Sequence, residues 1–169
     1  MEANEGKRGE YLERIQDIAA EKLVYIDESG IEMTAVKERG WGKKGELLIG
    51  KKSGKHYQRS NVVNKQAIAP MVFNGTCNTE LFNKWIEEFL IKELKPGQVV
   101  IMDNATFHKS ERTQALIESV GCKVIFLPPY SADLNPIEKF WANMKRWIAE
   151  NLINFSSLFD ALSHFFCNV

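Results

Sequence analysis

Three short apolar runs constrain this chain more than any other feature of its sequence. Residues 23–26, 99–102 and 123–127 form these runs, and each of them stops at turn-forming residues. Helical patterns follow the second and the third run. Apolar runs of this length are typical of buried strands in a sheet that helices cover on both faces. The order predicts an α/β fold: a mixed sheet, with an antiparallel meander and parallel strands, flanked by helices.

Apolar periodicity predicts four helices, over residues 10–20, 79–94, 110–120 and from residue 135 onward. Residues 61–69 and 71–73, separated by a proline, are interpreted as two strands of the meander. Asn135 suits the N-cap of the last helix and Pro136 suits its first position. Gly121 suits the C-terminal cap of the helix over residues 110–120.

Composition excludes several classes of protein. The 169 residues are 44% apolar and 26% charged, which are ordinary values for a globular domain and not for a disordered chain. No apolar run reaches the roughly 18–20 residues of a membrane span, and the N-terminus has no signal-peptide pattern. Three scattered cysteines predict neither a disulfide framework nor a structural zinc site. We therefore expect a cytoplasmic protein with no membrane partner.

Positive charge is concentrated in one segment of a chain whose formal net charge is zero. Residues 37–65 hold nine lysines and arginines against two glutamates, and five glycines interrupt them. This composition predicts a basic hairpin or long loop. It could contact DNA phosphates or form a solvated surface, and Trp41 within it could stack on a base or pack beneath the loop.

Carboxylates stand at the ends of predicted elements. Asp27 and Asp103 each follow an apolar strand, and Glu138 lies in the first turn of the last helix. Ligand sites of α/β sheets collect at strand ends, and three converging carboxylates need a cation such as Mg²⁺ to offset their repulsion. Alternation along a strand excludes Glu28 from the face of Asp27. The simpler alternatives are that the aspartates bind turn amides and that Glu138 completes a capping box.

His108 leaves three interpretations open: a surface residue, a DNA contact, or a hydrogen-bond partner of the acidic site. It lies five residues after Asp103.

Two segments resemble the catalytic domain of DDE transposases. They are VVIMDNATFHKS at residues 99–110 and FLPPYSADLNPIEKFWANMKRWI at residues 126–148. The most similar family is the bacterial insertion-sequence six-thirty family, related to mariner elements. VYIDESG at residues 24–30 and ERGWGKKG at residues 38–45 are similar to earlier motifs of that family, so the likeness covers about residues 20–150.

The resemblance implies a ribonuclease-H-like fold and a two-metal reaction. Asp27, Asp103 and Glu138 would be the catalytic residues and would hold two Mg²⁺ or Mn²⁺ ions, with Asn104 and Asn135 supporting them. Water would cut the end of a transposon, and the liberated 3′-hydroxyl would attack target DNA. Ala132 replaces the proline usual in the family, which we expect to loosen its turn slightly. The implied DNA contacts are Lys43, Lys44, Lys51, Lys52, Lys55, Arg59 and His108.

The predicted organisation is an N-terminal helical remnant or linker at residues 1–22 and a catalytic domain at residues 23–169, with the basic excursion at about 37–60. Relatives carry helix-turn-helix domains ahead of the catalytic core, so we expect the second half of a split reading frame with a separate N-terminal DNA-binding half, a degraded copy, or an excised domain. We expect double-stranded DNA as the partner, a homodimer as the assembly on that DNA, and the bacterial nucleoid as the location. Two alternatives are a silent DNA-binding or oligomerisation fragment and a general ribonuclease-H-like nuclease.

Overall fold

A mixed four-stranded sheet forms the centre of the protein. The computed structural model describes residues 4–31, 62–63, 69–73 and 77–168. The strands are β1 (Leu23–Ile26), β2 (Val62–Val63), β3 (Val99–Met102) and β4 (Lys123–Phe126), in the spatial order β2-β1-β3-β4. β1, β3 and β4 are parallel, and β2 is antiparallel to β1. The carboxyl ends of the three parallel strands therefore meet at one edge of the sheet.

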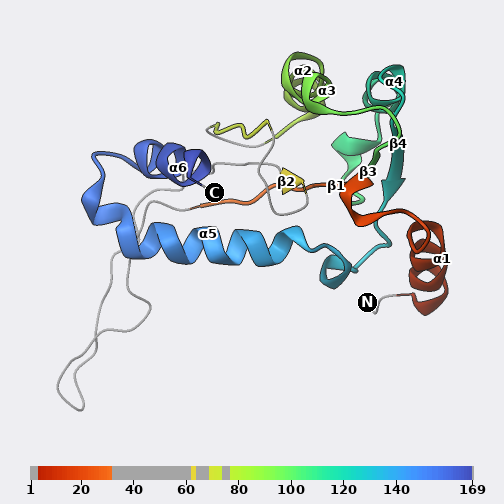
Figure 1. The fold of residues 1–169 in the computed structure, drawn as a ribbon, viewed down its shortest axis with the longest axis horizontal. Helices are drawn as coiled ribbons and strands as arrows, with labels where there is room; N and C mark the ends of the chain where they lie inside the picture. The colour runs from red at the N-terminus through yellow and green to blue at the C-terminus, as the bar shows by residue number, and fades with distance from the viewer. Residues whose placement is uncertain (1–3, 32–61, 64–68, 74–76, 169) are drawn as a thin grey trace, which may run out of the picture.

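Strand side chains alternate between the two faces of the sheet, and helices α2, α3 and α4 lie together on one side of it (Figure 1). Val24, Ile26, Val100 and Met102 face the layer that contains α2, α3 and α4. Leu23, Val99 and Ile101 face the opposite side. Both faces are covered, which explains why the parallel strands are continuous apolar runs in the sequence.

The first layer is built from helices that begin at polar caps. α2 (Thr79–Trp85) continues through a π-helical turn at Ile86–Leu90 into α3 (Ile91–Glu93). The Asn78 side chain accepts the Leu81 N–H at the start of α2. Ser110 caps α4 (Glu111–Ser119) in the same way, through the Thr113 N–H.

The long helix α5 (Ile137–Asn151) and α6 (Leu158–Cys167) pack against each other, and Tyr25 of β1 contacts the core cluster that they form. The buried stripe of α5 is Ile137, Trp141, Met144 and Ile148, at the spacing of one helical face. This stripe holds α5 in place, so the first turn of the helix, which carries Glu138, is fixed at the carboxyl edge of the sheet.

The N-terminal helix α1 (Glu5–Ile15) packs on the sheet. Asn4 caps it through the Lys7 N–H, and Tyr11 is buried beside Leu23, Val99 and Ile101. Short 3₁₀ turns complete the described elements, at Ala20–Lys22, Thr106–Lys109, Ala132–Leu134 and Leu152–Asn154.

Several predicted boundaries differ from the structure. The helix expected at residues 10–20 begins at Glu5 and ends at Ile15, because the Asn4 side chain caps it well before the apolar spacing begins. The strand expected at 71–73 is wrong, since these residues form no strand, and of the strand expected at 61–69 the described part pairs only at Val62–Val63. The sequence pattern did not predict α6 as a separate helix. No helix within the described ranges has the length and apolar character needed to cross a membrane.

Candidate functional site

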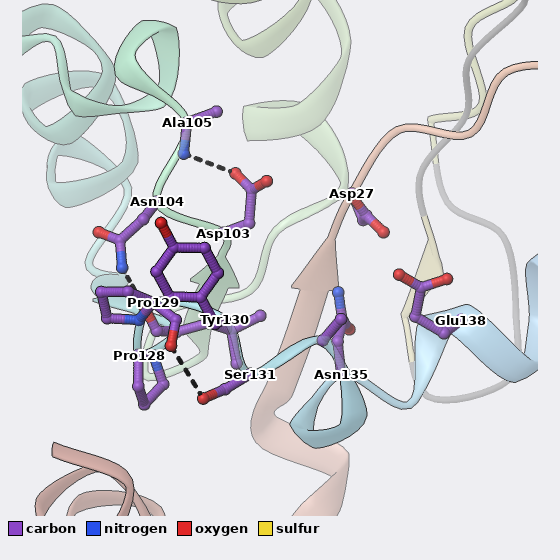
Figure 2. Close-up of a pocket in the computed structure, with 12 residues that line it drawn as sticks. Asp27, Asp103, Asn104, Ala105, Pro128, Pro129, Tyr130, Ser131, Asn135 and Glu138 are labelled. Atoms are coloured by element: carbon purple, nitrogen blue, oxygen red, sulfur yellow. Dashed lines mark hydrogen bonds between the residues drawn. The ribbon is translucent and has the colours of Figure 1, made fainter. Parts of the chain in front are cut away.

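A cleft of about 240 Å³ opens at the carboxyl edge of the sheet. It combines the ends of β1 and β3, the loop after β4 and the first turn of α5 (Figure 2). Its lining residues are Asp27, Asp103, Asn104, Ala105, Leu127, Pro128, Pro129, Tyr130, Ser131, Ala132, Asn135 and Glu138. All three acids singled out in the sequence lie in this one cleft.

Asp27 directly follows β1. Its Oδ1 accepts the Glu28 backbone N–H at 2.8 Å, so it does bind a turn amide, as the simpler interpretation proposed. Burial, together with the negative charges of Glu138 and Asp103, raises the pKa of Asp27 to about 7, against the bond from the Glu28 N–H that lowers it. The pKa of a turn aspartate in solvent would not be raised in this way by burial and by neighbouring carboxylates.

Asp103 follows β3 and uses one of its two oxygens for local bonds. Oδ1 lies 2.9 Å from the Ala105 N–H, which donates to it, and 2.6 Å from His108 Nδ1. Burial alone would raise the pKa of Asp103, but the bonds from His108 and Ala105 outweigh burial and lower it. The bonds to described residues therefore favour an ionised Asp103 whose Oδ2 is not engaged by them.

His108 is fully buried behind Asp103. Its Nδ1 contacts Asp103, and its Nε2 lies 3.5 Å from Glu28 Oε1. Burial would lower the pKa of His108, but the interactions with Asp103 and Glu28 raise it to about 9. Of the three interpretations of His108, the surface residue is wrong, and the hydrogen-bond partner of the acidic site is the one that its contacts support.

Glu28 is the residue that sequence reasoning missed. Alternation along the strand places it away from Asp27, as expected, but that direction leads to His108 and so to the back of Asp103. The signal available in the sequence is an acid next to Asp27 and a histidine five residues after Asp103, and only the fold connects these two features.

Glu138 lies in the first turn of α5 and faces Asp27 in Figure 2. The buried Asn135 accepts the Ile137 N–H at 3.4 Å, which supports the start of the helix one residue later than predicted. The Asn135 backbone N–H donates a hydrogen bond to the Ala132 carbonyl and is therefore not paired with the Glu138 side chain. The capping-box alternative for Glu138 is therefore not what the structure has.

The loop after β4 forms the remaining wall of the cleft. Asn104 donates its side-chain amide to the Leu127 carbonyl, which ties the end of β3 to this loop. Tyr130 has a left-handed backbone with φ 57° and an exposed ring at the rim of the cleft. The Asn104 and Asn135 side chains thus hold backbone around the acids.

The donor set fits a hard divalent cation by its chemistry. Three carboxylates line one cleft, and their mutual repulsion raises the pKa of Asp27. Among the described residues, however, no three acidic, histidine or cysteine side chains converge as a ready group of metal ligands. In Figure 2, Asp27 and Glu138 point toward one another, while Asp103 turns toward Ala105.

The predicted DNA contacts in the basic segment cannot be placed beside this cleft. Lys43, Lys44, Lys51, Lys52, Lys55 and Arg59 all lie outside the described residues, as does Trp41.

Several solved structures share this fold. The Mos1 transposase paired-end complex with left transposon end matches with a TM-score of 0.70 and 16% identity, over 100% of this chain and 57% of that one. The Mos1 transposase catalytic domain with Raltegravir and Mn matches with a TM-score of 0.68 and 18% identity, over 100% and 86%. The catalytic core domain of BIV integrase matches with a TM-score of 0.50 and 14% identity, over 85% and 79%. The chain thus has the ribonuclease-H-like fold of transposase and integrase catalytic cores, and it spans a little over half of the first of these chains.

A search among curated proteins gives no match. A family model described as DDE superfamily endonuclease matches residues 22–159, which include all four strands and the three acids of the cleft. The chain belongs to the DDE superfamily of endonucleases.

Proposed function

We propose that this chain is the catalytic domain of a DNA transposase of the mariner superfamily, most similar to the bacterial insertion-sequence six-thirty family. One observation carries the proposal: Asp27, Asp103 and Glu138, which come from two strand ends and one helix, line a single cleft. The endonuclease family and the ribonuclease-H-like fold support it.

In this proposal the three acids hold two Mg²⁺ or Mn²⁺ ions. When bound, such ions lower the pKa of an attacking water or hydroxyl and stabilise the leaving oxygen of a phosphodiester. Asp27 and Asp103 present carboxylates from the rigid ends of adjacent parallel strands, and α5 supplies Glu138. Asn104 and Asn135 keep the surrounding backbone in place through the Leu127 carbonyl and the Ile137 N–H.

The proposed substrate is double-stranded DNA at transposon ends and at a target site, in the bacterial nucleoid. Two of the similar Mos1 structures support it, since one is a paired-end complex with a transposon end and the other is a strand transfer complex. We take the catalytic domain to run from residue 23 to 169. Its basic segment, at about residues 37–60, would contact DNA phosphates. A homodimer on DNA and a separate N-terminal DNA-binding half complete the proposal.

A nicking assay tests the function directly. We expect the chain to nick duplex DNA in the presence of Mg²⁺ or Mn²⁺, and we expect EDTA to abolish this nicking. Asp103→Asn, Asp27→Asn and Glu138→Gln should each lower the rate about a hundredfold or more, because several kcal/mol of charge stabilisation is lost at about 1.4 kcal/mol per tenfold. Adding a separately supplied N-terminal half should direct the nicks to a transposon end.

Asp160→Asn is the matched control, since Asp160 lies on α6 and bonds to Ser156 and Ser157. Its rate should equal that of the unchanged protein. Nicking that persists in EDTA, or full activity of Asp103→Asn, would contradict the proposal.

One observation favours a second candidate, a catalytically silent DNA-binding or oligomerisation fragment. Asp103 is turned toward Ala105 and His108, so the three described acids do not converge on one point. A silent fragment would bind DNA without nicking it under any metal, and its binding would be unaffected by the three acid substitutions.

A further inference from the structure

We propose that Glu28 and His108 are positioning residues that hold the Asp103 carboxylate in one orientation from behind the cleft. The inference rests on the proposed function, because it concerns how the same acidic site receives a divalent cation. It adds two residues to the site, and it assigns His108 a task other than contact with DNA.

The first link of this chain of contacts is the bond between His108 and Asp103. Nδ1 lies 2.6 Å from Oδ1, and an ionised carboxylate can only accept, so Nδ1 carries the proton and donates it. The Ala105 N–H donates to the same oxygen at 2.9 Å. Two donors on Oδ1 fix the plane of the carboxylate and direct cation binding to Oδ2.

The second link is the contact between His108 and Glu28. Nε2 lies 3.5 Å from Glu28 Oε1, on the side of the ring opposite Asp103. The Glu28 side chain is only 12% exposed, and its backbone N–H donates to Asp27 Oδ1 at 2.8 Å. Glu28 therefore contacts Asp27 through its backbone and reaches Asp103 through the imidazole.

The ring itself is held by aromatic neighbours. The Phe82 ring centroid lies 4.4 Å from that of His108, and the Phe107 centroid lies 4.3 Å from it. A fully buried ring in this setting cannot rotate away from the two carboxylates without disturbing the packing of α2. The arrangement resembles the hydrogen-bonded partners that orient ligands from behind in many metal sites.

Substitutions can separate packing from positioning. His108→Phe keeps an aromatic ring between Phe82 and Phe107 but removes both nitrogens. Glu28→Met keeps the length of the side chain but removes the acceptor, whereas Glu28→Gln keeps an oxygen that can face Nε2. His164→Phe is the control for histidine replacement, because His164 stacks on Trp147 away from the cleft.

The first measurement is the affinity for Mn²⁺ alone, by calorimetric titration without DNA. We expect Glu28→Met and His108→Phe to weaken binding about tenfold or more, in the range found for such supporting residues. The double variant should bind no more weakly than His108→Phe, because both act through one ring. Glu28→Gln should stay within about threefold of the unchanged protein, and His164→Phe should match it.

The second measurement uses the ring ¹⁵N shifts of His108 in EDTA, where no metal contributes. Glu28→Met should shift Nε2 and Asp103→Asn should shift Nδ1, while His164→Phe shifts neither. Additive losses of Mn²⁺ affinity in the double variant, equal losses for Glu28→Gln and Glu28→Met, or a ring that does not respond to Glu28→Met would overturn the inference. If the unchanged protein binds no Mn²⁺ but the ring responds, the proposed function fails while the contact stands.

Discussion

Asp27 is half-buried at the end of a strand and lies near the carboxylates of Glu138 and Asp103, so its ionisation opposes the stability of the fold. Burial and the charges of Glu138 and Asp103 raise its pKa to about 7. A cation in the cleft would offset the same repulsion. In the absence of metal the ionised Asp27 therefore lowers the stability of the fold, and the same carboxylate is suited to bind a cation.

The raised pKa of Asp27 predicts that the stability of the metal-free protein, measured in EDTA, depends on pH. A carboxyl whose pKa is higher in the folded than in the unfolded chain contributes stability below its unfolded pKa and loses it as pH rises through the folded value. Between about pH 5 and pH 8 the unchanged protein should lose stability relative to Asp27→Asn. From pH 5 to pH 8 the stability of the variant relative to the unchanged protein should rise by on the order of 3 kcal/mol, because about two pH units of this window lie below the folded pKa; urea unfolding measures it.

Asp17→Asn is the control, because Asp17 is exposed just beyond the end of α1. The stability of this variant relative to the unchanged protein gives the baseline for replacing an exposed carboxylate by an amide. The prediction fails if the difference in unfolding free energy between Asp27→Asn and the unchanged protein stays constant from pH 5 to pH 8, because the pKa of Asp27 would then not be raised by folding.

At this scale the sequence could predict the acids but not their supports. Strand ends and a helix start placed Asp27, Asp103 and Glu138 at one edge, and the cleft contains all three. The contact of Glu28 with His108 could not be predicted, because it depends on the 3₁₀ turn at Thr106–Lys109 that brings His108 against Asp103 and Glu28. That these acids are catalytic stays a prediction.

Among the helices, the end of α4 depends on one glycine. Gly121 has φ +75°, and a Cβ there would lie 3.3 Å from the Pro96 Cβ. Its N–H donates to the Glu118 carbonyl, and its carbonyl accepts the Gly97 N–H, which joins the end of α4 to the turn before β3. The conformation and the proline together disfavour a side chain at this position.

Gly121→Ala should therefore destabilise the protein by about 1–2 kcal/mol, the cost of a left-handed backbone for an ordinary residue. Gly9→Ala is the matched control, because Gly9 lies inside α1 and a Cβ added there would meet nothing within 4 Å. It should stabilise by about 0.5–1 kcal/mol, since alanine favours a helix. Urea unfolding of both variants checks the two opposite signs, and a neutral Gly121→Ala would contradict this explanation of the cap.

The sequence predicted elements best where apolar spacing was long and regular. α5 and its stripe were expected, and so was the Gly121 cap. The helix over residues 79–94 was expected as one piece, but a π-helical turn at Ile86–Leu90 interrupts it. Such a turn changes the register of side chains without any break in composition, so periodicity alone does not show it.

Across the whole molecule, charge is unevenly distributed although it sums to zero. The segment 37–65 carries a net charge of +7, and the rest of the chain offsets it. If this segment contacts DNA, binding should weaken steeply with salt, because each neutralised phosphate releases counterions. Changing Lys43, Lys44, Lys51 and Lys52 to glutamine should lower the slope of log affinity against log salt by roughly 3–4.

Lys84→Gln with Lys92→Gln is the control, since both lysines are on the layer of α2 and α3. Fluorescence anisotropy with a duplex at several salt concentrations gives the slopes. An unchanged slope in the fourfold variant would indicate that the basic segment is a solvated surface.

The fold class could be predicted for the whole chain because parallel strands covered on both faces leave a strong apolar signal. The strand order could not, since pairing of β1 with β3 joins residues far apart in the sequence. The division of the chain at residue 22 stays a prediction, although Tyr11 of α1 packs on the same sheet as the strands.

Anomalous diffraction from crystals soaked in Mn²⁺ examines the acidic cleft most directly. We predict two manganese peaks about 3.5–4 Å apart, bounded by the carboxylates of Asp27, Asp103 and Glu138, and none in crystals of Asp103→Asn. Crystals of the unchanged protein that show no manganese between these side chains, or show it only elsewhere on the surface, would contradict the assignment of this cleft as the site of DNA cleavage.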